Sequence, residues 1–165
     1  MEIKTIYGVE FEVHKGGKIE GDFVYKGKNI YIEGDLEVTG RFECERFKIT
    51  GSVKVAKSYI VNKWEEVGGS QKVGEYQEVG WSQKVGGYQK VGEYQKVGGD
   101  SIIKLGTVVM LSMTIKGKLA VGKRIFAGIC NWGDASDEDM KITCQELVSG
   151  EVVHGELVET GIKKK

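Results

Sequence analysis

Two histidines are the side chains of this chain whose type best suits proton transfer near neutral pH. His14 and His154 each stand alone within two residues of a glycine, and neither belongs to a Ser/His/Asp or Cys/His pattern that can be read in the sequence. The segment GGKIEG, residues 16–21, lacks the Lys-Ser/Thr ending of a phosphate-binding loop. We therefore expect no enzyme, no catalytic residues and no cofactor.

Cysteines and carboxylates are the other groups that could do chemistry, as metal ligands. Cys44, Cys130 and Cys144 are widely separated and lack CxxC spacing, which is typical of reduced thiols in a cytoplasmic protein. The segment GDASDED, residues 133–139, gathers acidic residues without the spacing of an EF-hand loop. We expect a solvated loop there and no metal site.

The overall composition says little about partners. The 165 residues include 24 basic and 24 acidic side chains, so the formal net charge is zero and nucleic acid is not a favoured partner. No run of 18 apolar residues is present, so we expect no membrane-bound protein. With 25 glycines and no proline, the chain favours many tight corners between short strands.

A six-residue repeat runs through the chain and would have to position every side chain named so far. KVGGYQKVGEYQKVGG, residues 84–99, places a Val-Gly pair in each unit, and an aliphatic residue or alanine keeps the same phase from Ile49 to Ala127. In the flanking units the residue two positions earlier is mostly apolar as well. Because residues two apart on a strand share a face, each unit predicts a very short strand with two inward side chains, followed by a corner.

The longer period predicts the cross-section. Residues 69–80 differ from residues 87–98 at only two positions, which favours 18 residues per turn and three strands per turn. The fold class is therefore an all-β, three-sided β-solenoid of about six turns. We expect an N-terminal cap with the first strands (1–29), the hexad solenoid (30–128) and a C-terminal capping segment with a basic tail (129–165). The predicted valine core consists of Val67, Val73, Val79, Val85, Val91 and Val97.

Polar residues take the second inward position in the central units: Glu65, Gln71, Gln77, Gln83, Gln89 and Gln95. A buried amide without partners costs ~1–3 kcal/mol. Gln71 over Gln89 and Gln77 over Gln95 would form amide ladders along the axis, as identical residues do in stacked sheets. The alternative is that these central turns are distorted, widened or hydrated.

Two features of the outer surface suggest contacts. Ile102, Val108 and Phe126 are outward apolar residues in the last regular turns, with Phe126 in the final unit, so either the tail or a second subunit should cover them. Tyrosines alternate with lysines on the outer side of the central strands, as on surfaces that bind nucleic acid or glycans. A solvated surface explains that second pattern better.

The segment GDLEVTGRFECERFKITGSVKVAKSYIVNKWEEVGGS, residues 34–70, resembles the bactofilins, polymer-forming β-helix proteins of the bacterial cytoskeleton. The resemblance covers roughly residues 30–128. It implies a right-handed, three-sided β-helix that polymerises end to end without a nucleotide. Family members usually carry Pro-rich disordered tails, which this chain lacks.

Three functions remain open at this point. The first is a non-enzymatic, cytoplasmic scaffold that self-associates into filaments or oligomers, with Phe126, Val108 and Ile102 as contact residues. The second is a left-handed β-helix acyltransferase of the hexapeptide type, although that unit has a small residue where this chain has Gln, Phe, Leu or Met. The third is a binding module that uses the Tyr/Lys face.

Overall fold

The computed structural model describes residues 2–129 and 137–161, which form a β-solenoid. All strands belong to one continuous 19-stranded sheet. A 3-10 helix, η1 (Asp137–Met140), precedes the last three strands. The strands are β1 (Ile3–Ile6), β2 (Val9–Ile19), β3 (Phe23–Val38), β4 (Phe42–Ile49), β5 (Val53–Val55), β6 (Tyr59–Val61), β7 (Glu65–Val67), β8 (Gln71–Val73), β9 (Gln77–Val79), β10 (Gln83–Val85), β11 (Gln89–Val91), β12 (Gln95–Val97), β13 (Ser101–Ile103), β14 (Thr107–Val109), β15 (Met113–Ile115), β16 (Lys118–Ala127), β17 (Lys141–Cys144), β18 (Glu146–His154) and β19 (Glu156–Glu159).

The short central strands follow the sequence repeat directly. From β5 to β15 each strand has three residues, with the first and third buried and the middle one turned outward. Each strand pairs in parallel with the strand one turn below and one turn above, so that Val85 lies between Val67 and Ile103. The predicted period of three strands per turn is confirmed.

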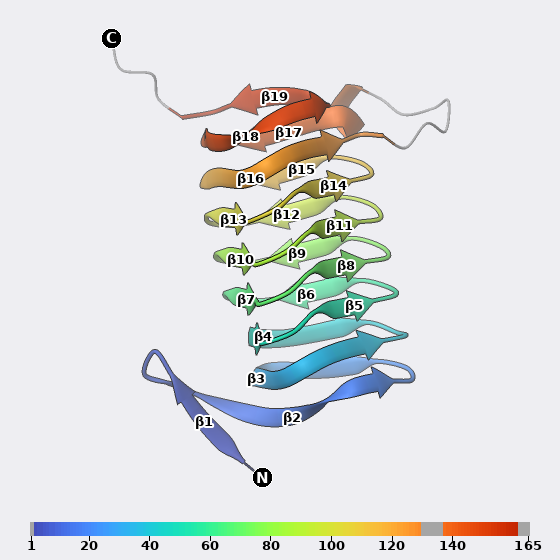
Figure 1. The fold of residues 1–165 in the computed structure, drawn as a ribbon, viewed down its shortest axis with the longest axis vertical. Coiled ribbons are helices and arrows are strands. Elements are labelled where there is room, and N and C mark those ends of the chain that lie inside the picture. The colour runs from blue at the N-terminus through green and yellow to red at the C-terminus, as the bar shows by residue number, and fades with distance from the viewer. Residues whose placement is uncertain (1, 130–136, 162–165) are drawn as a thin grey trace.

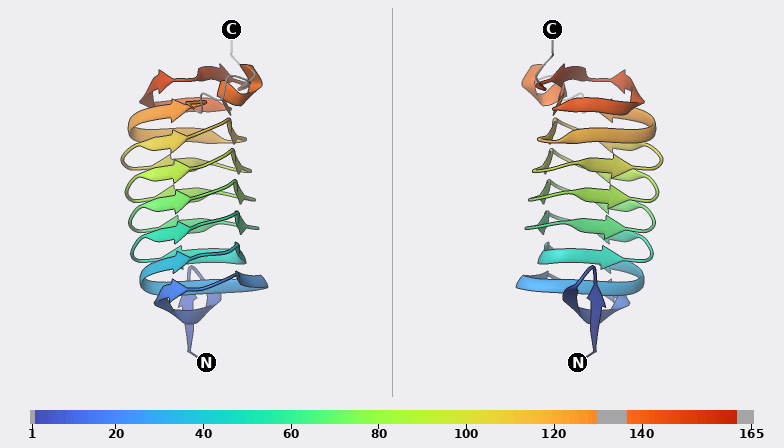
Figure 2. Two further views of the ribbon diagram at one scale, coloured as in Figure 1. Left: turned by 90° about the vertical axis from the view of Figure 1, so that its right-hand side faces the viewer. Right: turned by 90° about the vertical axis from the view of Figure 1, so that its left-hand side faces the viewer.

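The coil is right-handed, as the resemblance to the bactofilins implies. In Figure 1 the near strands β5, β8 and β11 run from left to right, the far strands β6, β9 and β12 return from right to left, and the chain rises from the N-terminus to the C-terminus. The two side views in Figure 2 show the turns stacked as flat, parallel layers. The left-handed coil of the acyltransferase alternative has the opposite hand.

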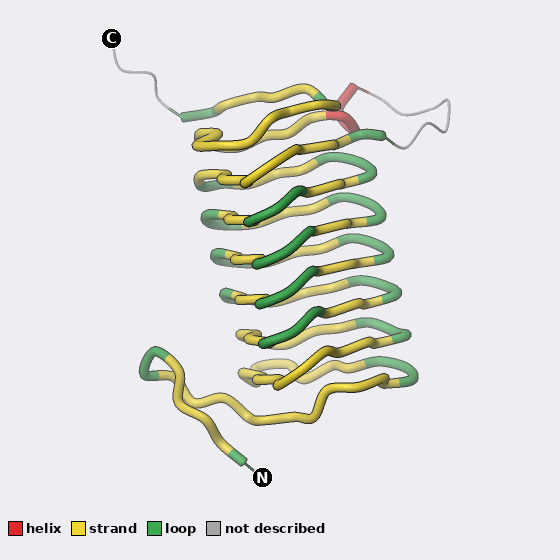
Figure 3. The backbone as a smooth tube through the Cα atoms, viewed as in Figure 1, coloured by secondary structure: helices red, strands yellow, loops and turns green. Residues whose placement is uncertain are grey.

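The glycine of each Val-Gly pair lies at a corner where two turns approach closely. A Cβ atom at Gly92 would overlap the carbonyl oxygen of Gly74 one turn below, and the Gly92 backbone N–H donates to the Val73 carbonyl at 2.8 Å. Polar side chains support other corners: Ser70 N–H donates to Ser52 Oγ at 2.9 Å. Figure 3 shows these corners as the loops between the short strands.

The solenoid is longer than the sequence predicted, with about eight turns instead of six. At the N-terminal end β2 already pairs in parallel with β3, and at the C-terminal end β17, β18 and β19 stack on β15, β16 and β17. These outer turns have longer strands with register shifts, and a segment is inserted after β16. They therefore do not keep the six-residue phase from which the number of turns is predicted.

The described part of the tail does not fold back over the outward apolar residues, so it does not provide the intramolecular cover that the sequence allows. This part, residues 137–161, forms the last turn of the coil. Ile102 keeps 41% of its surface exposed. The parallel ladder explains this outcome, because strand edges at the top of the stack offer more backbone hydrogen bonds than a sheet face does.

Candidate functional site

The described residues contain no obvious catalytic centre. His14 Nε2 lies 3.4 Å from Glu12 Oε1, and His154 Nδ1 lies 2.7 Å from the Ala127 carbonyl. Within residues 2–129 and 137–161, no group of three or more His, Cys, Asp or Glu side chains could hold a metal ion. Cys44 and Cys144 are buried and free, whereas Cys130 and most of the acidic segment 133–139 lie outside the described residues.

The inward glutamines form a continuous buried column, and all five are at most 1% exposed. Gln89 Nε2 donates to Gln71 Oε1 at 2.8 Å, and Gln95 Nε2 donates to Gln77 Oε1 at 2.7 Å. These are the two hydrogen bonds along the axis that the sequence predicts between stacked glutamines. Gln77 Nε2 also donates to Gln71 Oε1 at 2.8 Å, which links two sides of the triangle.

Hydroxyl groups end the polar column toward the C-terminus. Thr107 Oγ1 donates to Gln89 Oε1 at 2.9 Å, and Gln83 Nε2 donates to Ser101 Oγ at 2.9 Å. On the third side the Gln95 carbonyl oxygen is buried without a hydrogen-bond partner, because Met113 lies above it. The column is thus satisfied on two sides and incomplete on the third.

A buried carboxyl group ends the column toward the N-terminus. The Tyr59 hydroxyl donates to Glu65 Oε1, and the Gln71 and Gln77 amides donate to the Glu65 oxygens at 3.0–3.2 Å. Burial raises the pKa of the Glu65 carboxyl from 4.5 to about 7, against the opposing effect of these hydrogen bonds. The hexad phase placed Glu65 inward, but its partner Tyr59 was missed.

The three outward apolar residues do not form one patch. Val108 and Phe126 are paired on adjacent strands, β14 and β16, whereas Ile102 lies on another side between Lys84 and Ala120. The sequence predicts Phe126 in the final unit, but Phe126 does not lie at the end of the stack. The strand β18 pairs above it and places His154 next in register. Its role in self-association stays a prediction.

A groove runs beside Val108 and Phe126. Its volume is about 960 Å³, and its walls include Tyr88, Lys90 and Lys123. Tyr88 is 54% exposed. A space with apolar, aromatic and cationic walls suits a ligand that carries both ring surfaces and negative charge.

Among residues 2–129 and 137–161, nothing pairs above the last turn at the C-terminal end of the solenoid. The inward residues of the last turn, Leu147, Val152 and Leu157, are only partly buried, whereas Leu119, Ile125 and Ile142 directly below them are 0% exposed. No described strand pairs with the upper edges of β18 and β19. In Figure 1 these two strands form the top layer of the stack.

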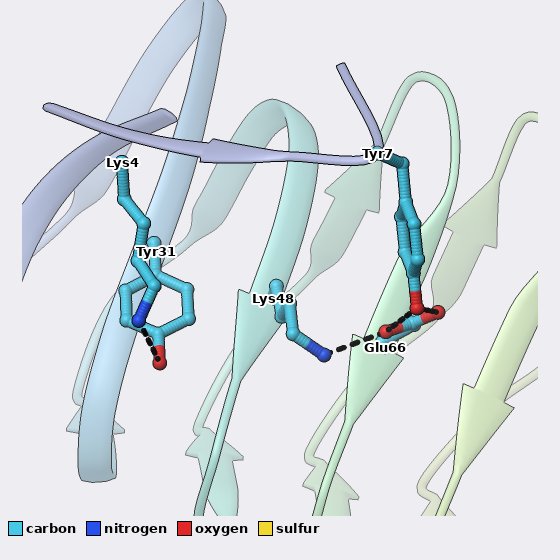
Figure 4. A network of polar contacts seen from close by, with 5 residues as sticks. All are labelled: Lys4, Tyr7, Tyr31, Lys48 and Glu66. Atoms are coloured by element: carbon cyan, nitrogen blue, oxygen red, sulfur yellow. Dashed lines mark hydrogen bonds and ion pairs between the residues drawn. The ribbon is translucent and has the colours of Figure 1, made fainter. Parts of the chain in front are cut away.

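The hairpin of β1 and β2 lies against the side of the first turns at the N-terminal end. Tyr7 and Gly8 form its turn with positive φ angles of 53° and 76°. The Tyr7 hydroxyl donates to Glu66 at 3.1 Å, and Lys48 Nζ lies 2.7 Å from the same carboxylate (Figure 4). Lys4 Nζ donates to the Tyr31 hydroxyl at 3.3 Å. The hairpin is therefore fastened along the side of the first turns.

Comparisons with protein-family models, with curated proteins and with solved structures give no match for this chain. None of the helices in the described part of the chain is long and apolar enough to cross a membrane.

Proposed function

We propose that this protein is a structural, non-enzymatic scaffold of the cytoplasm that self-associates end to end. The observation that carries the proposal is the open last turn, which combines free strand edges with a half-buried apolar core. Such an edge is a template for a further strand, and its apolar residues gain free energy when they are covered.

The opposite end offers a complementary surface. Beyond the part of β2 that pairs with β1, residues 15–19 have a strand only on the β3 side within the described structure. A contact between the top of one solenoid and the bottom of the next is head to tail, so it generates a filament unless the rotation closes a ring. The resemblance to bactofilins supports the same mode of association.

Sedimentation velocity over a concentration series, with electron microscopy of the same samples, tests this function. We expect the wild-type protein to form rods that lengthen with concentration. Val152→Lys places a charge in the open end and should leave mostly monomers, while the circular dichroism spectrum stays β-like. A wild type that remains monomeric throughout the series would refute the proposal.

A matched variant separates end contacts from side contacts. Ile102→Lys introduces the same charge on a side wall, where the residue is already exposed. Rods should persist in this variant. Loss of assembly in Ile102→Lys, with assembly retained in Val152→Lys, would instead assign the contact to the side of the solenoid.

A further inference from the structure

Three lysines lie in register on one side of the solenoid. Lys54, Lys72 and Lys90 are the outward residues of β5, β8 and β11, and each pairs directly with the next. Neighbouring strands place them one strand spacing apart, about 4.8 Å. We call these three residues the lysine column.

The other two sides of the same turns are built differently. One side places Glu66 between Lys48 and Lys84. On the remaining side Glu78 pairs with Lys96. Like charges directly opposite each other are destabilising, and these two sides avoid that cost. In the lysine column three like charges do lie directly opposite one another, although the chain as a whole has a formal net charge of zero and so has acidic residues that could have alternated with them.

Most of the charge in the lysine column is left without a protein partner. Lys54 Nζ lies 4.0 Å from Glu37 Oε2, at the edge of an ion pair. Lys72 and Lys90 have no ion pair within residues 2–129 and 137–161, and all three lysines are exposed. The column is therefore free to meet an external anion.

The groove beside Phe126 continues the column toward the C-terminus. Lys90 belongs to both, and Lys123 adds a further exposed cation to the groove. Arg124 is held by Glu151, with 3.7 Å between Nε and Oε1. A second groove of about 370 Å³ includes Lys54 and Lys72 on the same side of the solenoid. Cations and concave surface thus follow one line parallel to the axis.

We propose that this line binds a linear acidic polysaccharide with one carboxylate per sugar ring. Carboxylates on the side of the chain that faces the protein would lie over the in-register ammonium groups of the lysine column. Ammonium groups donate charge-assisted hydrogen bonds to carboxylates. The Tyr88 ring and Phe126 give the apolar face of a sugar a surface to stack on inside the larger groove.

The aromatic side chains favour a polysaccharide over a single-stranded nucleic acid. Sites for single strands stack successive bases on successive aromatic rings. Along this line Tyr88 is the exposed aromatic residue, and the next outward positions above the column are Val108 and Phe126 on β14 and β16. The Tyr88 and Phe126 rings lie in the larger groove, whereas no aromatic residue lines the smaller groove around Lys54 and Lys72, so the line offers a stacking surface to one sugar but not to a run of bases.

Isothermal titration calorimetry with a size-fractionated galacturonate oligomer tests the site. The double variant Lys72→Glu/Lys90→Glu should raise Kd by about tenfold or more. The matched control is Lys84→Glu/Lys96→Glu. It replaces two lysines at the equivalent outward positions of the other two sides, so it changes the net charge by the same amount, and it should keep Kd within about twofold. All four lysines are exposed, so both variants should fold.

Two further ligands complete the experiment. The methyl-esterified oligomer, which lacks charge, should bind much more weakly than the free acid, and added salt should weaken binding of the free acid. Absence of binding of the free acid at millimolar concentration would overturn the proposal. Equal losses in both double variants, or tighter binding of oligothymidylate than of the oligomer, would overturn it as well.

Discussion

The first turns and the central turns of this solenoid solve the same packing problem with different side chains. Near the N-terminus the inward positions hold aromatic rings, with Phe42 stacked between Phe23 and Tyr59 at ring-centroid distances of 5.4 and 4.8 Å. In the centre the same positions hold Gln71, Gln77 and their neighbours, joined by hydrogen bonds. A column of valines is common to both regions. The backbone therefore tolerates either core, because nearly all buried polar atoms of the amide column find partners, with the Gln95 oxygen as an exception.

The largest expected effect comes from breaking the aromatic core. Phe42→Ala removes a ring that is 0% exposed and packed between two others, and should lower the free energy of unfolding by about 3–5 kcal/mol. Urea denaturation measures this change. A loss below about 1 kcal/mol would mean that this turn repacks easily and that the two cores do not differ in rigidity.

The carboxyl group at the boundary between the two cores should make stability depend on pH. The folded-state pKa of Glu65 is raised to about 7, so the folded state holds a proton that the unfolded chain releases above pH 4.5. The stabilisation is complete below pH 4.5 and is lost as the pH rises to about 7, by ~3 kcal/mol at most.

Glu65→Gln serves as the control for this pH dependence, because it keeps the side-chain length and cannot ionise. Between pH 4.5 and 8 the free energy of unfolding of the variant should depend much less on pH than that of the wild type. Other groups, such as Glu12 with its lowered pKa beside Lys28, contribute equally to both proteins and cancel in the difference. Equal slopes for wild type and variant would show that Glu65 does not titrate in this range.

Within the amide column, Gln77 should matter more than its neighbours. Its side chain bonds to Glu65, Gln71 and Gln83, and it also accepts from Gln89 and Gln95. Gln77→Leu leaves several buried groups without partners and should cost about 2–3 kcal/mol. A thermal melt that matches wild type would show that the remaining amides rearrange without loss.

The smallest effect is expected at the incomplete side of the column. The Gln95 side chain makes one hydrogen bond, from Nε2 to Gln77 Oε1, and its own Oε1 is buried without a partner. Gln95→Leu exchanges that oxygen for a side chain that packs against Met113, so stability should change by less than about 1 kcal/mol. A loss as large as that of Gln77→Leu would indicate that the amides act as one unit.

The sequence predicted the regular part of the fold well for a physical reason. Each Gln-Lys-Val unit fixes both the strand and the direction of its side chains, so Val91 and Gln89 could be placed inward from spacing alone. The outer turns lack this redundancy, and β18 pairs with β16 across an inserted segment whose length no period predicts.

The candidate sites were less visible in the sequence. The bond between Tyr59 and Glu65 depends on how far two long side chains reach across the interior. The 18-residue turn already predicts that Lys72 lies under Lys90 and that Lys84 lies on another side, but only the structure shows that neither Lys72 nor Lys90 has an ion-pair partner among the described residues. Phe126 seemed terminal because the regular phase stops there, although the coil continues.

The stacking of each turn on its immediate neighbours also makes the length of the rod adjustable. Residues 69–80 and 87–98 are nearly the same sequence one turn apart, so a duplication of 18 residues inserts a complete layer with its own corners and core. Each such layer would move the two ends apart by about 4.8 Å and leave both end surfaces unchanged. The distance between the two ends can therefore change in evolution by one turn at a time, through duplication or deletion of 18 residues.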